Sequence, residues 1–164
     1  MSSLQIIFVL VLSLLLVGVL VFGATAVRGA LVLRSTTADA GWLGRIGRAT
    51  DRDVQRWAFV AHRVTGVAVF AFLALHVFDV SLLAVSASRF DDVHRLYGTA
   101  PMRFFETLLC AAILFHTFNG LRLVLLDVAE LGVETARRLL YGAVALTLVL
   151  GALAGVLILR PAFS

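Results

Sequence analysis

Apolar residues dominate the chain in four long stretches, and the charged residues gather mostly between them. The stretches cover residues 1–27, 57–83, 104–128 and 139–159. A helix needs about 20 apolar residues to cross a hydrocarbon core about 30 Å thick. Because each stretch is long enough, the pattern predicts an all-α transmembrane helix bundle with four membrane-spanning helices.

The first stretch has some features of a secretory signal peptide. However, it has no positive charge at its start, and its apolar run over 6–22 is longer than the usual roughly 7 to 15 residues. We therefore expect residues 1–27 to be a retained transmembrane helix. An arginine-rich loop, 28–56, with a glycine- and serine-containing linker over 34–53, would separate it from a three-helix core over 57–164.

The composition places the chain far from soluble proteins. It is 61% hydrophobic and 15% charged, whereas soluble domains are roughly 45–50% apolar and roughly 25% charged. All 14 basic residues are arginine, and the net charge is +4. With so few charges, this excess indicates arginine-rich loops beside a membrane and no nucleic-acid partner. The single Cys110 excludes a disulfide framework and a cysteine cluster for zinc or iron–sulfur ligation.

The arginines also predict the topology, because short cytoplasmic loops collect positive charge. Six arginines lie in the segment 28–56 and two in the connection between the third and fourth stretches, which is on the same side of the membrane. Four lie on the opposite side. We expect both termini outside and the long loop in the cytoplasm. In the fourth stretch, Gly151 and Gly155 form a G-x-x-x-G pair, which favours close helix approach.

Ionisable side chains inside a membrane are costly and usually face a partner, a cavity or a pathway. Besides Glu106 at an end, seven lie within the second and third stretches: His62, Arg63, His76, Asp79, His116, Arg122 and Asp127. The arginines either snorkel to the interface or pair with an anionic group such as a haem propionate. We expect Glu106 to be solvated at an outer helix end, and His94 to be a solvated loop residue without a role.

Two histidines share a spacing. His62 precedes Gly66 and His116 precedes Gly120 by four residues, so each glycine lies on its histidine's helix face. The missing side chain leaves a shallow groove that suits a flat ring, as beneath a porphyrin with an axial histidine. Chance, with the glycines serving helix packing, is the alternative interpretation.

Depth separates His76 from His116. Counted from the inner helix ends, His76 lies about 28 Å and His116 about 16 Å into the membrane. This difference is too large for one iron, so if both histidines bind haem they bind different haems. Asp79, three residues after His76, either orients that imidazole or is a hydrogen-bonded group near the outer surface.

The runs His-Arg-Val-Thr-Gly over 62–66 and His-Thr-Phe-Asn-Gly-Leu-Arg over 116–122, followed by Asp127, resemble a known family. They are similar to the cytochrome b membrane anchor of succinate dehydrogenase, the larger of its two anchors, over roughly 57–159. In two places the chain departs from the family pattern. Leu123 replaces a frequent second histidine, and Phe59 replaces a quinone-site serine.

The resemblance implies electron transfer from succinate to quinone by a subunit that anchors the flavoprotein and iron–sulfur subunits to a bacterial or archaeal cell membrane. His116 would ligate haem b, with the other ligand from a second membrane-anchor subunit, and Gly120 and Arg122 would contact the haem. His62, Arg63 and the Phe59 position would form the menaquinone or ubiquinone site, with His62 as a proton donor near neutral pH. No catalytic nucleophile is expected in this chain.

His76 resembles the first-core-helix ligand of the two-haem branch, so we expect a second haem there, with a hydrogen-bonded core histidine as the alternative. Three further interpretations stay open. They are a haem-free structural anchor of the same complex, a fumarate reductase anchor, and a transporter or assembly factor with Arg63, Asp79 and Arg122 in a polar pathway.

Overall fold

The computed structural model describes residues 2–36 and 42–162, with side chains over 2–31 and 54–161. Its helices are α1 (Ser3–Thr36), α2 (Trp42–Val85), α3 (Ala87–His94), α4 (Ala100–Val128) and α5 (Val133–Leu159), with short 3-10 helices over Arg95–Gly98 (η1) and Arg160–Ala162 (η2). Four segments are long and apolar enough to cross a membrane: Ser3–Leu31, Val54–Val85, Ala100–Val128 and Val133–Leu159. The predicted all-α transmembrane bundle is confirmed.

Helices extend into the segment that we expected to be a loop. α1 continues to Thr36 and α2 already begins at Trp42, so much of 28–56 is helical. An α-helix satisfies its own backbone hydrogen bonds in lipid and in water alike. The chain has two prolines, Pro101 and Pro161, and neither lies in this segment. Nothing there removes a backbone donor, so the helices continue past the apolar residues.

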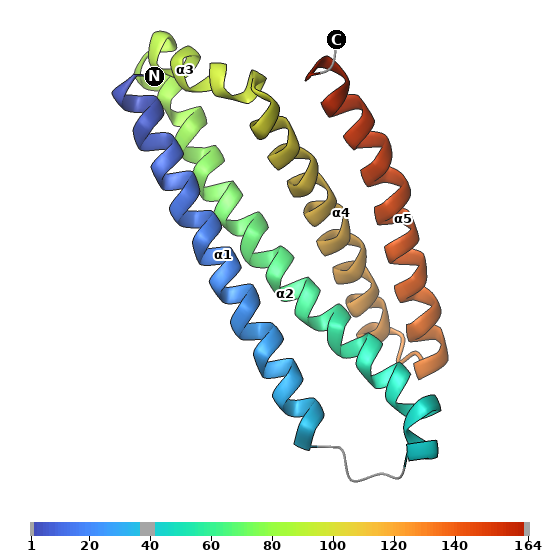
Figure 1. Ribbon diagram of the computed structural model, residues 1–164. Coiled ribbons are helices and arrows are strands. Elements are labelled where there is room, and N and C mark those ends of the chain that lie inside the picture. Colours follow the sequence, from blue (N-terminus) through green and yellow to red (C-terminus); the bar gives the residue numbers. More distant parts are fainter. Residues whose placement is uncertain (1, 37–41, 163–164) are drawn as a thin grey trace.

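The four long helices lie side by side in the order α1, α2, α4, α5 (Figure 1). α3 and η1 connect the ends of α2 and α4 beside the start of α1 (Figure 1). Both ends of the chain lie at this end of the bundle, as four spans require. We call it the outer end, following the topology expected from the arginines.

α1 is packed into the bundle rather than separated from it. Phe8 is 1% exposed and lies in a core cluster with Leu75, Leu82, Val93 and Met102. The Ser2 hydroxyl donates a hydrogen bond to the Asp92 carboxylate, and the Gln5 amide donates to the Asp92 carbonyl oxygen over 2.7 Å. Hydrogen bonds from Ser2 and Arg95 lower the pKa of Asp92. These contacts fix the start of α1 to α3.

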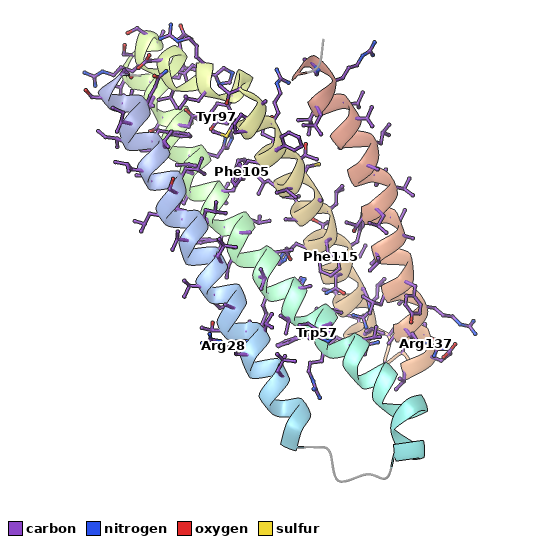
Figure 2. All side chains as sticks on the ribbon, in the orientation of Figure 1. Arg28, Trp57, Tyr97, Phe105, Phe115 and Arg137 are labelled. Atoms are coloured by element: carbon purple, nitrogen blue, oxygen red, sulfur yellow. The ribbon has the colours of Figure 1, made fainter. Side chains whose placement is uncertain are left out.

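Large apolar side chains cover the outside of the bundle and project away from it (Figure 2). Leu14 is 72% exposed, Phe70 72% and Leu108 70%. Apolar surface of this extent is rare on a soluble monomer, whereas lipid or another membrane subunit covers it without cost. Few residues remain buried inside the single chain, and they set its helix contacts.

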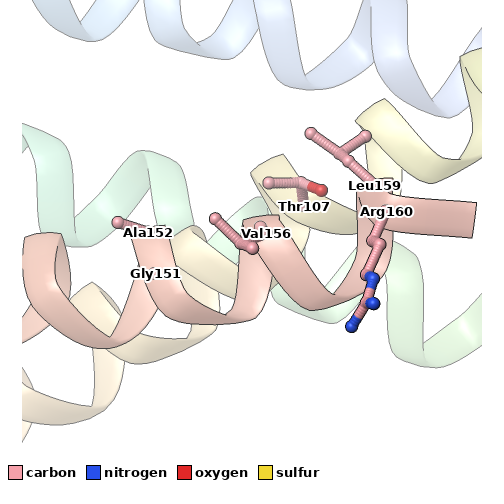
Figure 3. A pocket seen from close by; sticks show the side chains of 7 residues that line it. Thr107, Gly151, Ala152, Val156, Leu159 and Arg160 are labelled. Carbon is pink, nitrogen blue, oxygen red and sulfur yellow. The ribbon is translucent and has the colours of Figure 1, made fainter. Parts of the chain in front are cut away.

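The two glycines of the G-x-x-x-G pair bring α5 against α4. A Cβ atom on Gly151 would lie 3.7 Å from the Ala111 side chain, and one on Gly155 would lie 3.1 Å from Thr107 Cγ2. Figure 3 shows Gly151 and Thr107 along the shallow groove that these small residues leave between the helices. The expectation of close approach is therefore confirmed.

We predict that Gly155→Val destabilises the α4–α5 contact. The added branched side chain has no room beside Thr107, and overpacking of this kind costs about 1–3 kcal/mol. Gly142→Val on the same helix is the matched control, because no atom lies within 4 Å of its added Cβ. The thermal midpoint of the purified complex should fall for Gly155→Val alone. An equal loss in both variants would contradict this packing.

The paired-histidine site

His62 of α2 and His116 of α4 stack face to face where the two helices cross. Their ring centroids are 4.1 Å apart and the planes differ by 3°. A Cβ atom on Gly66 would lie 2.8 Å from His116 Cε1, and one on Gly120 would lie 3.3 Å from His62 Cε1. Each glycine thus makes room for the histidine of the other helix. The pattern predicted the groove, but in this structure it accommodates an imidazole.

The hydrogen bonds of His116 determine which ring nitrogen carries the proton. Its Nδ1 lies 3.1 Å from the carbonyl oxygen of His62 and 3.4 Å from the Thr65 hydroxyl. The Thr65 hydroxyl donates its own proton to the Ala61 carbonyl oxygen over 2.8 Å. Because a carbonyl oxygen can only accept, Nδ1 of His116 is the donor. In the neutral ring, Nε2 then keeps its lone pair.

His62 and Asn119 each bury a polar atom that has no hydrogen-bond partner in the described part of the chain. These atoms are His62 Nδ1 and Asn119 Nδ2. Buried polar atoms are nearly always paired in folded proteins. The surroundings of the stacked rings thus hold two polar atoms whose hydrogen-bonding capacity is unused among the described residues.

Arg122 lies at the inner side of the histidine pair and does not snorkel. It is 4% exposed and donates from Nε to the Ala136 carbonyl oxygen over 3.0 Å and from a terminal nitrogen to Asn119 Oδ1 over 3.1 Å. Another terminal nitrogen donates to the Gln55 side chain. These acceptors are neutral, and no carboxylate of the described side chains forms an ion pair with Arg122. The arginine joins α4 to α2 and α5, and no acidic side chain that the structure describes balances its charge.

Arg63 lies apart from the histidine pair. Its guanidinium is over the Phe59 ring at 5.5 Å and the Phe22 ring of α1 at 5.9 Å. All of these contacts are cation–π interactions. The structure therefore brings together two of the expected quinone-site residues, Arg63 and Phe59, and it places the third, His62, with His116.

His76 is far from the histidine pair, as the depth estimate predicted. It lies 14 residues beyond His62, or about 21 Å along α2, and its exposed ring stacks on Phe72 at 5.5 Å. Asp79 does not share these surroundings. It is 4% exposed and lies against Tyr97, whose pKa is raised by burial and by this carboxylate. Asp79 therefore faces Tyr97 near the outer end, and its Oδ1 is buried without a hydrogen-bond partner among the described residues.

Some features of the site were not foreseen. Asn119 is fully buried, and its position inside an apolar run was the signal that could have identified it. Glu106 is half-buried beside Tyr97 rather than fully solvated. His94 is exposed as expected, but it ends helix α3 and stacks on Phe90 at 5.0 Å.

Comparison with known proteins gives the family. Residues 45–154 match the model for the succinate dehydrogenase/fumarate reductase transmembrane subunit. The chain is 35% identical over 117 residues to the succinate dehydrogenase 2 membrane subunit SdhC of Mycobacterium tuberculosis, covering 68% of this chain and 86% of the relative. It is 30% identical over 114 residues to the succinate dehydrogenase hydrophobic membrane anchor subunit of Halobacterium salinarum, covering 69% and 87%. The chain therefore belongs to the family of succinate dehydrogenase and fumarate reductase transmembrane subunits, as a membrane anchor.

Proposed function

We propose that this subunit binds haem b through His116 and passes electrons from succinate to a quinone, while it anchors the flavoprotein and iron–sulfur subunits. The observation that carries the proposal is the hydrogen bond from His116 Nδ1 to the His62 carbonyl oxygen, which leaves Nε2 available. Metal-ligating histidines almost always donate their other ring N–H to such an acceptor. When bound, haem supplies one-electron redox chemistry.

Several residues fit a haem beside His116. The carbonyl of His62 fixes the orientation of the His116 ring, and Gly66 leaves the space in which that ring lies. Arg122 is a buried cation whose described partners are all neutral, so an anionic propionate would supply the missing counter-charge. With a second axial ligand from the companion anchor subunit, the iron would have no open position, which suits electron transfer.

The quinone site in this proposal lies toward the inner end of α2, with His62, Arg63 and Phe59. His62 Nδ1 has no hydrogen-bond partner in the described part of the chain, and once the ring turns from this buried position, an imidazole N–H there would be a suitable donor to a quinone oxygen. His62 would also hold a proton for quinone reduction at that atom. Phe59 is 55% exposed and carries the Arg63 cation on its ring, which leaves both open to a bound menaquinone or ubiquinone.

His76 is proposed to ligate a second haem near the outer end. Its ring is exposed inside the segment Val54–Val85, which is apolar enough to cross the membrane. An imidazole facing lipid there is unfavourable, so a cofactor or a companion subunit is needed to cover it. The distance of about 21 Å along α2 from the histidine pair requires a separate haem.

A haem-free anchor of the same complex is the second candidate. The observation in its favour is the stacking of His62 on His116, because the two rings fill the space between α2 and α4 by themselves. Within the family, an anchor of fumarate reductase is a further alternative, since the matching family model covers both enzymes.

His116→Ala is expected to remove the haem and weaken assembly, because the axial nitrogen is lost. Two quantities are measured on the purified complex: the reduced-minus-oxidised optical spectrum and the haem content per flavin. His94→Ala, at the exposed outer end, should keep the wild-type b-type band. Absence of that band from the wild-type complex would favour the haem-free anchor.

Gly66→Ala should displace the His116 ring without removing it. The new methyl group would lie 2.8 Å from His116 Cε1, so the ring must move. Overpacking costs about 1–3 kcal/mol, which corresponds to a loss of haem affinity of about fivefold or more. Gly29→Ala is the control, because its added Cβ meets no atom within 4 Å. Equal haem retention in both variants would contradict the contact between Gly66 and the ligand.

His76→Ala should lower haem content from two per complex to one and leave the His116 haem in place. Haem extraction with quantification per flavin checks this stoichiometry. The same haem content in wild type and His76→Ala would refute a second haem at this position.

A further inference from the structure

α1 lies outside the part of the chain that matches the family model, residues 45–154, yet it is fixed against α2 toward the inner end of the bundle (Figure 1). Arg56 of α2 donates from a terminal nitrogen to the Ala30 carbonyl oxygen of α1 over 3.3 Å. Nearer the outer end, a Cβ atom on Gly23 would lie 3.7 Å from the Val64 side chain, so the backbones approach closely there. These two contacts set the register between the two antiparallel helices.

The register brings Phe22 of α1 to Arg63 of α2. The guanidinium carbon of Arg63 lies 5.9 Å from the centroid of the Phe22 ring and 5.5 Å from that of the Phe59 ring. Phe22 and Arg63 each lie nine residues inside their apolar spans, Ser3–Leu31 and Val54–Val85, or about 14 Å from the inner ends. A cation at this depth is costly, and the two aromatic faces offset part of that cost.

The two rings contact the charge of Arg63 but leave its hydrogen-bond donors unused. A guanidinium has five N–H donors and no acceptor. Arg63 is exposed in the single chain, and among the described residues its contacts are the two rings, with no hydrogen bond or ion pair. A quinone carbonyl oxygen could accept from these donors inside an apolar segment because it is uncharged. A lipid phosphate would have to leave the headgroup layer to reach them, at a large cost in hydration.

We propose that Phe22 is a positioning residue of the quinone site, whose ring keeps the Arg63 guanidinium in place for a quinone carbonyl oxygen. The inference rests on the proposed function. An arginine side chain has several rotatable bonds, so holding it before the quinone arrives lowers the entropy that is lost on binding. Through Phe22, α1 contributes to quinone affinity without touching the quinone. Loss of the ring should therefore raise the KM for quinone and leave kcat little changed.

The test measures succinate-driven reduction of a short-chain ubiquinone and a short-chain menaquinone by the purified complex. Phe22→Leu removes the ring and keeps an apolar side chain, whereas Phe22→Tyr keeps the ring. Leu20→Ala is the matched control, because Leu20 is 63% exposed on the same helix. Phe8→Leu loosens α1 in the core cluster at the outer end, far from the arginine. Arg63→Gln removes the cation itself.

Phe22→Leu is expected to raise the KM for quinone about two- to thirtyfold, which corresponds to a cation–π contact of about 0.5–2 kcal/mol. Phe22→Tyr, Leu20→Ala and Phe8→Leu should keep the wild-type KM. Because Phe22 acts through Arg63, Phe22→Leu should add no further increase to a complex that already carries Arg63→Gln.

A wild-type KM in Phe22→Leu, together with a raised KM in Arg63→Gln, would overturn the inference and leave the quinone site in place. An equal rise in Phe8→Leu or in Phe22→Tyr would also overturn it, because helix packing and not the aromatic ring would then be responsible. A wild-type KM in Arg63→Gln would refute the proposed quinone site itself and leave a lipid phosphate as the partner of this arginine.

Discussion

The close contact between α2 and α4 at Gly66 and Gly120 is the constraint on which the site depends. In lipid, helices gain little from burying apolar side chains, so they associate where small residues let backbones approach. Here the small residues face the two histidines, and the space between the backbones is already occupied by imidazole rings. Helix packing and the orientation of the histidine rings therefore depend on the same contact, and neither can change alone.

The buried Arg122 also shapes the site. Arg122 uses neutral oxygens of α2, α4 and α5 as acceptors, so these described partners hold three helices together and leave its charge unbalanced. A buried cation of this kind lowers the energy of any negative charge nearby. It would favour the reduced form of a cofactor, and a propionate beside it would weaken that effect, because the two charges partly neutralise one another. The positive charge of Arg122 would thus stabilise an anion bound near the inner end of the bundle.

The sequence was sufficient for the helix positions, because lipid demands long apolar segments and the chain has four. It also identified His62, His116 and their glycines, since a spacing of four places residues on one helix face. It could not show that each glycine faces the opposite histidine, because the register between α2 and α4 is set by their packing. Nor could it show that Arg122 turns toward Gln55 and Asn119, because snorkelling and burial are equally compatible with its position. The sequence did not predict that the helices continue into 28–56. Polar residues indicate where the chain leaves the lipid, but a helix can continue beyond that point.

The attachment of α1 at the outer end has a consequence for the order of assembly. Phe8 finds its core neighbours in α2, α3 and the first turn of α4, as far along the chain as Met102. The hydrogen bonds of Ser2 and Gln5 likewise require Asp92, which lies far along the chain. Contacts between such distant residues cannot form until the later segment has been synthesised and inserted. Helix α1 therefore reaches its final position only after α2 and the start of α4 have been synthesised.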